Sequence, residues 1–321
     1  MRAVHLTEHT GPDGLRVVDV DEPAADGKVV VDLHAAGVAF PDLLQTRAGY
    51  QVVKQLPAVL GFEGAGTVRS APDGSGLAPG ARVAVLAEQG SWQQTVAVDP
   101  ASIFPIPDHV SFGAGAGFLL NYLTVHFALD KRAHYSPGET VLVHGAAGGV
   151  GIAALQMARA LDLETIAVVS NEAKAAVAHA NGATHVIGVE NFKDRVQEIT
   201  DGRGVDIVLD PVGGDRFTDS LRSLARGGRA VVLGFTGGGI PTVKVNRLLL
   251  NNISVVGAGW AEWMRNDPSF PAHQWETVGA LLESGKLQIE EPTAYPMDDI
   301  ASGLRALADR SAAGKIVITL G

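Results

Sequence analysis

Residues 140–154, TVLVHGAAGGVGIAA, decide the fold, because a short apolar run, a burst of glycines and an alanine-rich segment follow one another directly. This order is typical of a buried strand, a tight turn and a helix that begins near Gly149. The turn carries an AxGxxG variant of the dinucleotide fingerprint, whose glycines let the backbone approach a pyrophosphate at the helix N-terminus. A ligand-free strand–helix turn is the alternative. The residues expected to bind the dinucleotide are Ala146, Gly148, Gly149, Val150 and Gly151.

After Ser111 the chain alternates strand-like with helix-like runs, which predicts a parallel sheet with helices on both faces. Six strand-like runs are enough for one doubly wound nucleotide-binding sheet. They are TVLVHG, TIAVVS, THVIG, VDIVLDPVGG, RAVVLGF and ISVVGAG. The expected fold class is therefore α/β, with a doubly wound parallel-sheet Rossmann domain beside a second domain.

The second domain is expected from the first part of the chain, where short β-rich runs are separated by turns. Two helices are expected at residues 272–286 and 297–311, and a last strand at 315–321 should return to the N-terminal sheet. Residues 257–270 hold two tryptophans in an expected loop that shapes a pocket or a dimer contact. The predicted domains are residues 1–117 with 260–321, and residues 118–259.

Composition narrows the function classes. The 321 residues are long enough for two cores, and the net charge of −10 argues against nucleic acid or an anionic membrane as partner. Cysteine is absent, so disulfides and thiolate chemistry are excluded, which fits a reducing cytoplasm. The N-terminus lacks the apolar region of a secretory signal. We expect a cytoplasmic protein.

The end of the second expected strand should decide which dinucleotide binds. An NAD site usually has a carboxylate there, which would repel the 2′-phosphate of NADPH. Here the strand ends with Ser170 and Asn171; the Ser170 hydroxyl can donate to a phosphate, and Lys174 can supply a countercharge. We expect these three residues to bind NADPH, although Lys174 also fits an exposed helix lysine.

Both expected domains contain recognisable motifs, which are GVAFPDLL, RAGYQ, LPAVLGFEGAGTV, NYLTVHFAL, VLVHGAAGGVG, DPVGG and GKIVITL. On these motifs the chain resembles, across its whole length, the zinc-free quinone oxidoreductase branch of the medium-chain dehydrogenase/reductase superfamily. The resemblance implies a GroES-like catalytic domain, a Rossmann domain, NADPH as cofactor and usually a homodimer.

No metal site is expected. Zinc-dependent members of the superfamily have a cysteine near the position of Ala39 and a histidine at that of Phe62, and neither residue here can ligate zinc. The ten histidines, including His144 beside the glycine turn, are interpreted as packing or surface residues. Hydride transfer is therefore expected to proceed without a Lewis acid.

Three residues are candidates for the chemistry, because hydrogen-bond donors must stabilise the oxygen that becomes negative. Tyr50 is the preferred proton donor, since similar enoyl thioester reductases carry a tyrosine acid in this loop; a packing aromatic is the alternative. Asp42 matches a position that serves shape or hydrogen bonding in the branch, and it either takes part in catalysis or caps a turn. Asn121 is expected near the substrate, although a partner within the helix would also satisfy it.

Thr124 lies three residues after Asn121, so both share one face of a helix, and by resemblance Thr124 approaches the nicotinamide. The ends of strands four and five should add Pro211, Val212, Gly234 and Phe235 as contacts to ribose and nicotinamide, unless these residues only form turns. The branch often has a tyrosine beside the adenine phosphate where this chain has Val189.

Together these features predict an NADPH-dependent, zinc-independent oxidoreductase that transfers hydride to quinones or other α,β-unsaturated carbonyls. Two alternatives stay open. An enoyl-thioester reductase would need a basic patch for the CoA phosphate, for which Arg47 and Lys54 are the nearby basic residues. A low-turnover NADPH-binding sensor or structural protein is the other.

Overall fold

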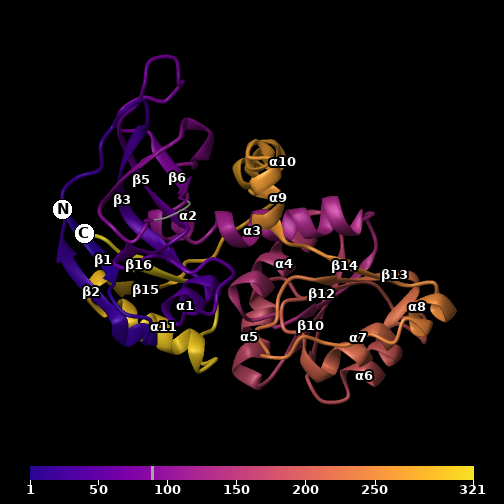
Figure 1. The fold of residues 1–321 in the computed structure, drawn as a ribbon. Coiled ribbons are helices and arrows are strands. Elements are labelled where there is room, and N and C mark those ends of the chain that lie inside the picture. The colour runs from indigo at the N-terminus through magenta and orange to yellow at the C-terminus, as the bar shows by residue number, and fades with distance from the viewer. Residues whose placement is uncertain (88–89) are drawn as a thin grey trace. The chain divides into compact units, whose positions relative to one another are not determined.

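The computed structural model describes residues 1–87 and 90–321, which form two compact units (Figure 1). The first unit comprises Met1–Leu120, Pro271–Glu283 and Ile289–Gly321, and the second comprises Asn121–Phe270 and Ser284–Gln288. The first boundary lies three residues after the predicted one. The second lies later than predicted, because Trp263 and Phe270 pack their rings on Phe127 of the second unit.

The first unit is built on mostly antiparallel strands, and β15 and β16 form a parallel pair. A seven-stranded sheet has the order β15-β16-β3-β5-β6-β8, with β7 also paired to β3, and a smaller sheet has the order β2-β1-β4. The strands are β1 (Arg2–Leu6), β2 (Leu15–Asp19), β3 (Val29–Val38), β4 (Ala58–Val59), β5 (Glu63–Ser70), β6 (Arg82–Leu86), β7 (Thr95–Val98), β8 (Ile103–Pro105), β15 (Thr293–Pro296) and β16 (Ile316–Thr319). The helices are α1 (Phe40–Thr46), α2 (Phe112–Ala116), α10 (Phe270–Glu283) and α11 (Ile300–Ala308).

The last strand confirms one prediction from the sequence. β16 returns to the N-terminal sheet and pairs with β3 in antiparallel register, from Ile316 opposite Val38 to Thr319 opposite Ala35. Three of its four residues are buried, so the apolar IVIT run belongs to the core of the first unit. The predicted helices of the tail are also present, as α10 and α11.

The second unit is a six-stranded parallel sheet of order β11-β10-β9-β12-β13-β14, which confirms the doubly wound α/β prediction. Its strands are β9 (Thr140–His144), β10 (Glu164–Val169), β11 (His185–Gly188), β12 (Val205–Asp210), β13 (Leu224–Val232) and β14 (Ser254–Gly257). Its helices are α3 (Leu119–His126), α4 (Gly149–Ala160), α5 (Glu172–Ala180), α6 (Phe192–Ile199), α7 (Phe217–Arg222), α8 (Asn246–Asn251) and α9 (Trp260–Asn266). The order reverses between β9 and β12, and this switch point is where such sheets bind ligands.

The loop expected at residues 257–270 is wrong, because α9 forms there. Gly259 precedes the helix, Glu262 and Arg265 form an ion pair three residues apart, and Trp260 is buried. Ala261, Glu262, Met264 and Arg265 favour a helix by their intrinsic propensity, and Trp263 packs its ring on Phe127.

No helix among the described residues is long and apolar enough to cross a membrane. The apolar stretch 140–158 is divided instead into β9, the glycine turn and most of α4.

Candidate functional site

The glycine turn joins β9 to α4 as the sequence predicts. Gly145 has φ +61°, a left-handed conformation that favours glycine, and its carbonyl accepts a hydrogen bond from Gly148 N at 2.9 Å. α4 begins at Gly149, and its N-cap is Gly148, which offers no side chain to the helix N–H groups. Because these N–H groups have no side-chain acceptor, the positive end of the α4 dipole is available to a phosphate.

The third glycine of the fingerprint serves packing. A Cβ at Gly151 would lie 2.5 Å from Ala146 Cα and closer still to Gly145 O, so only glycine lets α4 approach the turn this closely. At Gly148 a Cβ would meet only Gly145 O, at 3.4 Å. The fold therefore requires glycine at position 151, whereas position 148 has space for a side chain.

Two further turns adjoin the first. A Cβ at Gly145 would lie 3.3 Å from Val212 Cγ2, which places the turn after β12 beside the glycine turn. Thr236 N and Oγ1 both donate to Pro211 O at 3.0 Å, and these bonds fix the turn after β13 against the turn after β12. The structure thus brings Pro211, Val212 and the 234–237 turn together at the carboxyl ends of the strands, and Phe235 in that turn is exposed.

A buried carboxylate holds the turn after β12. Asp210 is 1% exposed, and its Oδ1 accepts hydrogen bonds from Val212 N at 2.8 Å and Gly213 N at 2.9 Å. Its Oδ2 has no partner among the described residues. Reasoning from sequence did not assign Asp210 a role, although an acidic residue ending an apolar strand is a usable signal.

His144 ends the neighbouring strand β9 and is completely buried. Its Nε2 lies 2.8 Å from Ser220 Oγ, and its ring packs edge-on against Phe192, so it is a packing residue in this structure. Burial lowers the pKa of His144 to about 4, which keeps the ring neutral at physiological pH. Its Nδ1 has no partner within the described parts of the chain.

Three residues after β10 are expected to bind the 2′-phosphate, and one of them caps a helix. Asn171 is the N-cap of α5, and its side-chain oxygen accepts from Lys174 N at 2.9 Å. Ser170 is exposed, and Lys174 lies half-buried in the first turn of α5. Since the Asn171 oxygen is engaged by the helix, Ser170 and Lys174 are the better placed of the three to meet a phosphate.

Asn121 and Thr124 lie on α3, as predicted. Asn121 is 6% exposed and Thr124 is half-buried, and within residues 1–87 and 90–321 neither side chain makes a hydrogen bond. An amide without a protein partner at this burial costs free energy unless a ligand or water meets it. No partner within the helix satisfies the Asn121 amide in the described chain, and a ligand contact stays a prediction.

In the first unit, Asp42 is fully buried and joins two segments. Its Oδ2 accepts from Ala39 N at 2.9 Å, which caps α1, and its Oδ1 accepts from Gly61 N at 3.2 Å. Burial raises the pKa of Asp42 to about 7, against the lowering effect of these hydrogen bonds. With both oxygens engaged by the backbone, the geometry favours the capping role over a direct part in proton transfer.

Tyr50 follows α1, is half-buried and packs edge-on against Phe62 with ring centroids 6.1 Å apart. Nearby, Glu63 is 1% exposed; its Oε1 pairs with Lys315 Nζ at 2.6 Å and its Oε2 accepts from Leu120 N at 2.8 Å. Sequence reasoning missed this buried ion pair, since its partners lie 252 residues apart.

Zinc does not fit these residues. Ala39 and Phe62 carry no donor atom, and Phe62 faces Tyr50 instead. Among the described residues there is also no group of three or more His, Asp or Glu that is arranged to hold a metal ion.

Comparison with known proteins places this geometry in a family. Residues 25–108 match the family model described as "Alcohol dehydrogenase GroES-like domain", and residues 149–283 match "Zinc-binding dehydrogenase". The first unit therefore contains the GroES-like domain, and the second is a Rossmann domain.

Relatives match over nearly the whole chain. The rat "Quinone oxidoreductase-like protein 2" is 33% identical and covers 99% of this chain and 92% of its own length. A probable oxidoreductase from Mycobacterium abscessus has a solved structure with TM-score 0.90 and 39% identity, covering 99% of this chain and 98% of its own.

The quinone oxidoreductase from Thermus thermophilus, whose structures include a complex with NADPH, has TM-score 0.85 and 33% identity over all of both chains. The protein is thus an oxidoreductase and belongs to the quinone oxidoreductase branch of the medium-chain dehydrogenase/reductase superfamily.

Proposed function

We propose that this protein is an NADPH-dependent reductase of quinones or other α,β-unsaturated carbonyls. The uncapped N-terminus of α4 supports the proposal most directly, because the open side of Gly148 and the free N–H groups fit a pyrophosphate. The adjoining turn at Pro211 and Val212 and the unpaired amide of Asn121 would contact the rest of the dinucleotide. NADPH is the cofactor bound by the similar enzyme from Thermus thermophilus.

The chain's own groups would then handle the charge and the proton. NADPH, when bound, supplies the hydride. Addition of hydride to a quinone or an α,β-unsaturated carbonyl leaves negative charge on the carbonyl oxygen of the acceptor. The Tyr50 phenol donates a hydrogen bond and then the proton to that oxygen, and the Asn121 amide orients the reacting groups. Asp42 would act indirectly. It fixes the N-terminus of α1, and Tyr50 lies on the segment that follows this helix in the chain.

Two other functions make different predictions about acceptors. An enoyl-thioester reductase would bind the CoA phosphates through basic residues such as Arg47, which is exposed, and Lys54. A sensor or structural protein would bind NADPH with little turnover. The observation that favours the reductase is the similarity over nearly the whole chain to quinone oxidoreductases, one of which has a solved complex with NADPH.

An acceptor screen tests the proposal. NADPH oxidation is followed at steady state with 1,4-benzoquinone, a 2-alkenal and crotonyl-CoA, and NADPH binding is measured separately by fluorescence. Turnover with the first two and not with crotonyl-CoA is expected. Preference for crotonyl-CoA would establish the thioester reductase instead, and tight NADPH binding without any turnover would establish the sensor.

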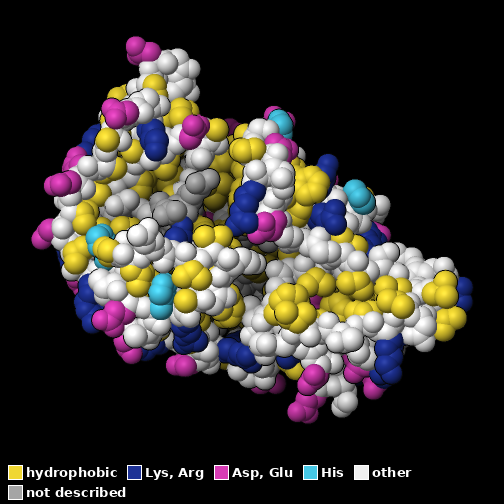
Figure 2. Space-filling model, in the orientation of Figure 1, with side chains coloured by type: hydrophobic (Ala, Val, Ile, Leu, Met, Phe, Trp, Pro, Cys, Tyr) yellow, Lys and Arg dark blue, Asp and Glu magenta, His cyan; other side chains and the backbone are white. Residues whose placement is uncertain are grey.

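We also propose that the protein is a homodimer formed through β14. β14 is an edge strand of the six-stranded sheet, and three of its four residues are exposed. Exposed apolar side chains gather over α8 and this edge, as Figure 2 shows; they are Ile240, Val245, Leu249, Leu250 and Val255. Two copies of one edge pair around a twofold axis, which closes both edges at once.

The dimer is tested by Leu249→Glu combined with Val255→Lys. The double variant should sediment as a monomer, while a Val52→Lys variant, also at an exposed apolar residue but in the first unit, should remain a dimer. A wild-type protein that is monomeric at micromolar concentration would disprove the dimer.

A further inference from the structure

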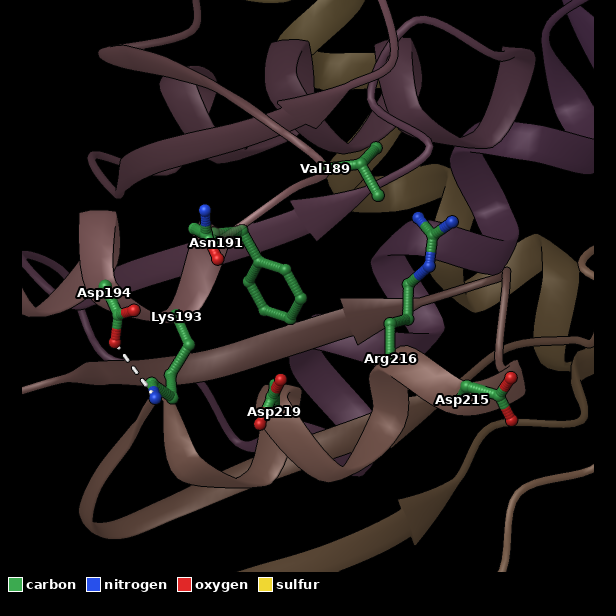
Figure 3. A pocket seen from close by; sticks show the side chains of 8 residues that line it. Val189, Asn191, Lys193, Asp194, Asp215, Arg216 and Asp219 are labelled. Carbon is green, nitrogen blue, oxygen red and sulfur yellow. Dashed lines mark ion pairs between the residues drawn. The ribbon is translucent and has the colours of Figure 1, made fainter.

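The second unit has a cavity that the proposed chemistry does not use. It has a volume of about 320 Å³ and lies beside the carboxyl ends of β11 and β12 (Figure 3). These strand ends share the edge of the sheet with the glycine turn. The lining residues are Val189, Asn191, Phe192, Lys193, Asp194, Asp215, Arg216 and Asp219.

Most charges at this cavity are already paired. Lys193 Nζ lies 2.9 Å from Asp194 Oδ1, and Asp219 Oδ1 lies 2.9 Å from Arg222 Nη1 on α7. Asp215 is exposed, so water screens its carboxylate. The acidic residues therefore leave Arg216 as the principal uncompensated charge at the cavity.

Arg216 is half-buried, and its guanidinium makes no hydrogen bond or ion pair with the described parts of the chain. It extends towards Val189, whereas the Asp215 side chain points away from it (Figure 3). A planar guanidinium that has lost part of its water and lacks a carboxylate partner is well suited to bind an anion such as a phosphate through two parallel hydrogen bonds.

The groups after β10 leave room for such a residue. The Asn171 oxygen is engaged by Lys174 N, and oxygen atoms of Asn171 and Ser170 bring no positive charge to a phosphate. A dianionic 2′-phosphate needs cationic partners, and Lys174 is the single cation that the sequence pattern assigned to it.

We propose that Arg216 is the specificity-determining residue for the 2′-phosphate of the cofactor, reached across the cavity from the start of α7. The inference rests on the proposed use of a dinucleotide and adds the residue that distinguishes NADPH from NADH. The apolar walls of the cavity, Val189 and Phe192, keep water away from the guanidinium and strengthen its interaction with the phosphate.

The test measures binding without turnover. Adenosine 2′,5′-bisphosphate and 5′-AMP are titrated calorimetrically into wild type, Arg216→Gln and Arg195→Gln. Arg195 is a matched control, because it is an arginine on the adjacent helix α6, pairs with Glu198 and does not line the cavity.

Arg216→Gln should weaken the bisphosphate by about 10- to 100-fold, the range of charge-assisted hydrogen bonds, and change 5′-AMP affinity by less than about twofold. Arg195→Gln should leave both affinities unchanged. Equal loss for both ligands in Arg216→Gln would overturn the inference, as would an unchanged bisphosphate affinity. If wild type bound none of the three ligands, adenosine 2′,5′-bisphosphate, 5′-AMP or NADPH, the proposed function itself would be overturned.

Discussion

The two units each bury a carboxylate that accepts two backbone hydrogen bonds, but they use it differently. Asp42 in the first unit uses one oxygen for Ala39 N and the other for Gly61 N. Asp210 in the second unit receives both hydrogen bonds on one oxygen and leaves the other without a partner in the described residues. Both carboxylates hold a turn in place, but only Asp210 keeps a buried oxygen without a partner in the described residues.

The same difference extends to the neighbouring groups. Near Asp42, the buried Glu63 is fully engaged by Lys315 and the backbone of Leu120. In the second unit, the Asn121 amide, the Arg216 guanidinium and the N–H groups of α4 have no such partners in the described chain. Buried polar atoms without partners occur in both units of the described chain, at Arg82 Nε and Ser91 Oγ in the first and at Asp210 Oδ2, His144 Nδ1 and Trp263 Nε1 in the second. The contrast between the units therefore concerns these particular carboxylates and their neighbours, not the whole of either unit.

The glycine turn gives the strongest test of this contrast, since it holds one glycine of each kind. Gly151→Ala should destabilise the protein by about 3 kcal/mol or more, because its Cβ would overlap the backbone of the turn. Gly148→Ala, whose Cβ is in ordinary contact with Gly145 O alone, should keep most of the stability and weaken NADPH binding. Urea unfolding and fluorescence titration measure the two effects. Equal stability of both variants would contradict the division of roles.

A buried group in each unit should make the free energy of unfolding depend on pH, and the two dependences have opposite signs. Asp42 has a pKa of about 7 in the folded state against 3.8 unfolded, so its contribution is full below pH 4 and is lost as the pH rises towards 7. His144 has a folded pKa of about 4 against 6.5, so its contribution is full above pH 6.5 and is lost as the pH falls towards 4.

Removing one group should therefore expose the slope of the other. Between pH 4 and 7, the unfolding free energy of Asp42→Asn should rise with pH, and that of His144→Asn should fall, each by about 1–3 kcal/mol. Denaturant unfolding at fixed pH steps gives both slopes, and slopes rather than absolute stabilities are compared because both substitutions disturb the core. Two slopes of the same sign would contradict the assignment.

The sheet of the second unit could be predicted because each strand is an apolar run that a parallel, doubly covered sheet buries on both faces. The strand β10, with five of six residues buried, is typical. Helix α9 was missed although Ala261, Glu262, Met264 and Arg265 all favour a helix, because the preceding glycines and the two tryptophans were interpreted as a loop. The packing of Trp263 on Phe127, more than 130 positions earlier, is the part of this region that local sequence does not contain.

The candidate site divides in the same way. The glycine fingerprint predicts its own geometry, because the requirement of Gly151 for close packing is local. Arg216 was missed because a charged residue at the start of an amphipathic helix is normally interpreted as solvent-exposed. Its place in the lining of a cavity is visible only in the structure. The Lys315–Glu63 pair has no signal in spacing at all.

In the first unit, Asp42 and Glu63 have structural roles, whereas we expect Tyr50 to take part directly in the reaction. Tyr50→Phe removes only the hydroxyl and retains the ring that packs on Phe62, so this aromatic contact should be kept. We expect kcat to fall about 100-fold, the usual scale for a general acid, with little change in NADPH affinity. Steady-state kinetics with a quinone and an enone measure the effect, and Phe62→Leu tests how far ring packing alone matters. Full activity of Tyr50→Phe would remove it from the mechanism.

Ser170→Asp should have the smallest effect, and it concerns an exposed residue of the second unit. A carboxylate at the end of β10 would repel a 2′-phosphate and accept hydrogen bonds from ribose hydroxyls, so preference should shift towards NADH. Because Ser170 is exposed and water screens the added charge, we expect a change of roughly tenfold in the NADPH/NADH ratio of kcat/KM, about 1.4 kcal/mol. Glu172→Gln, which changes charge two residues away on α5, is the control. An unchanged ratio in Ser170→Asp with a lowered one in Arg216→Gln would place recognition of the phosphate at α7 alone.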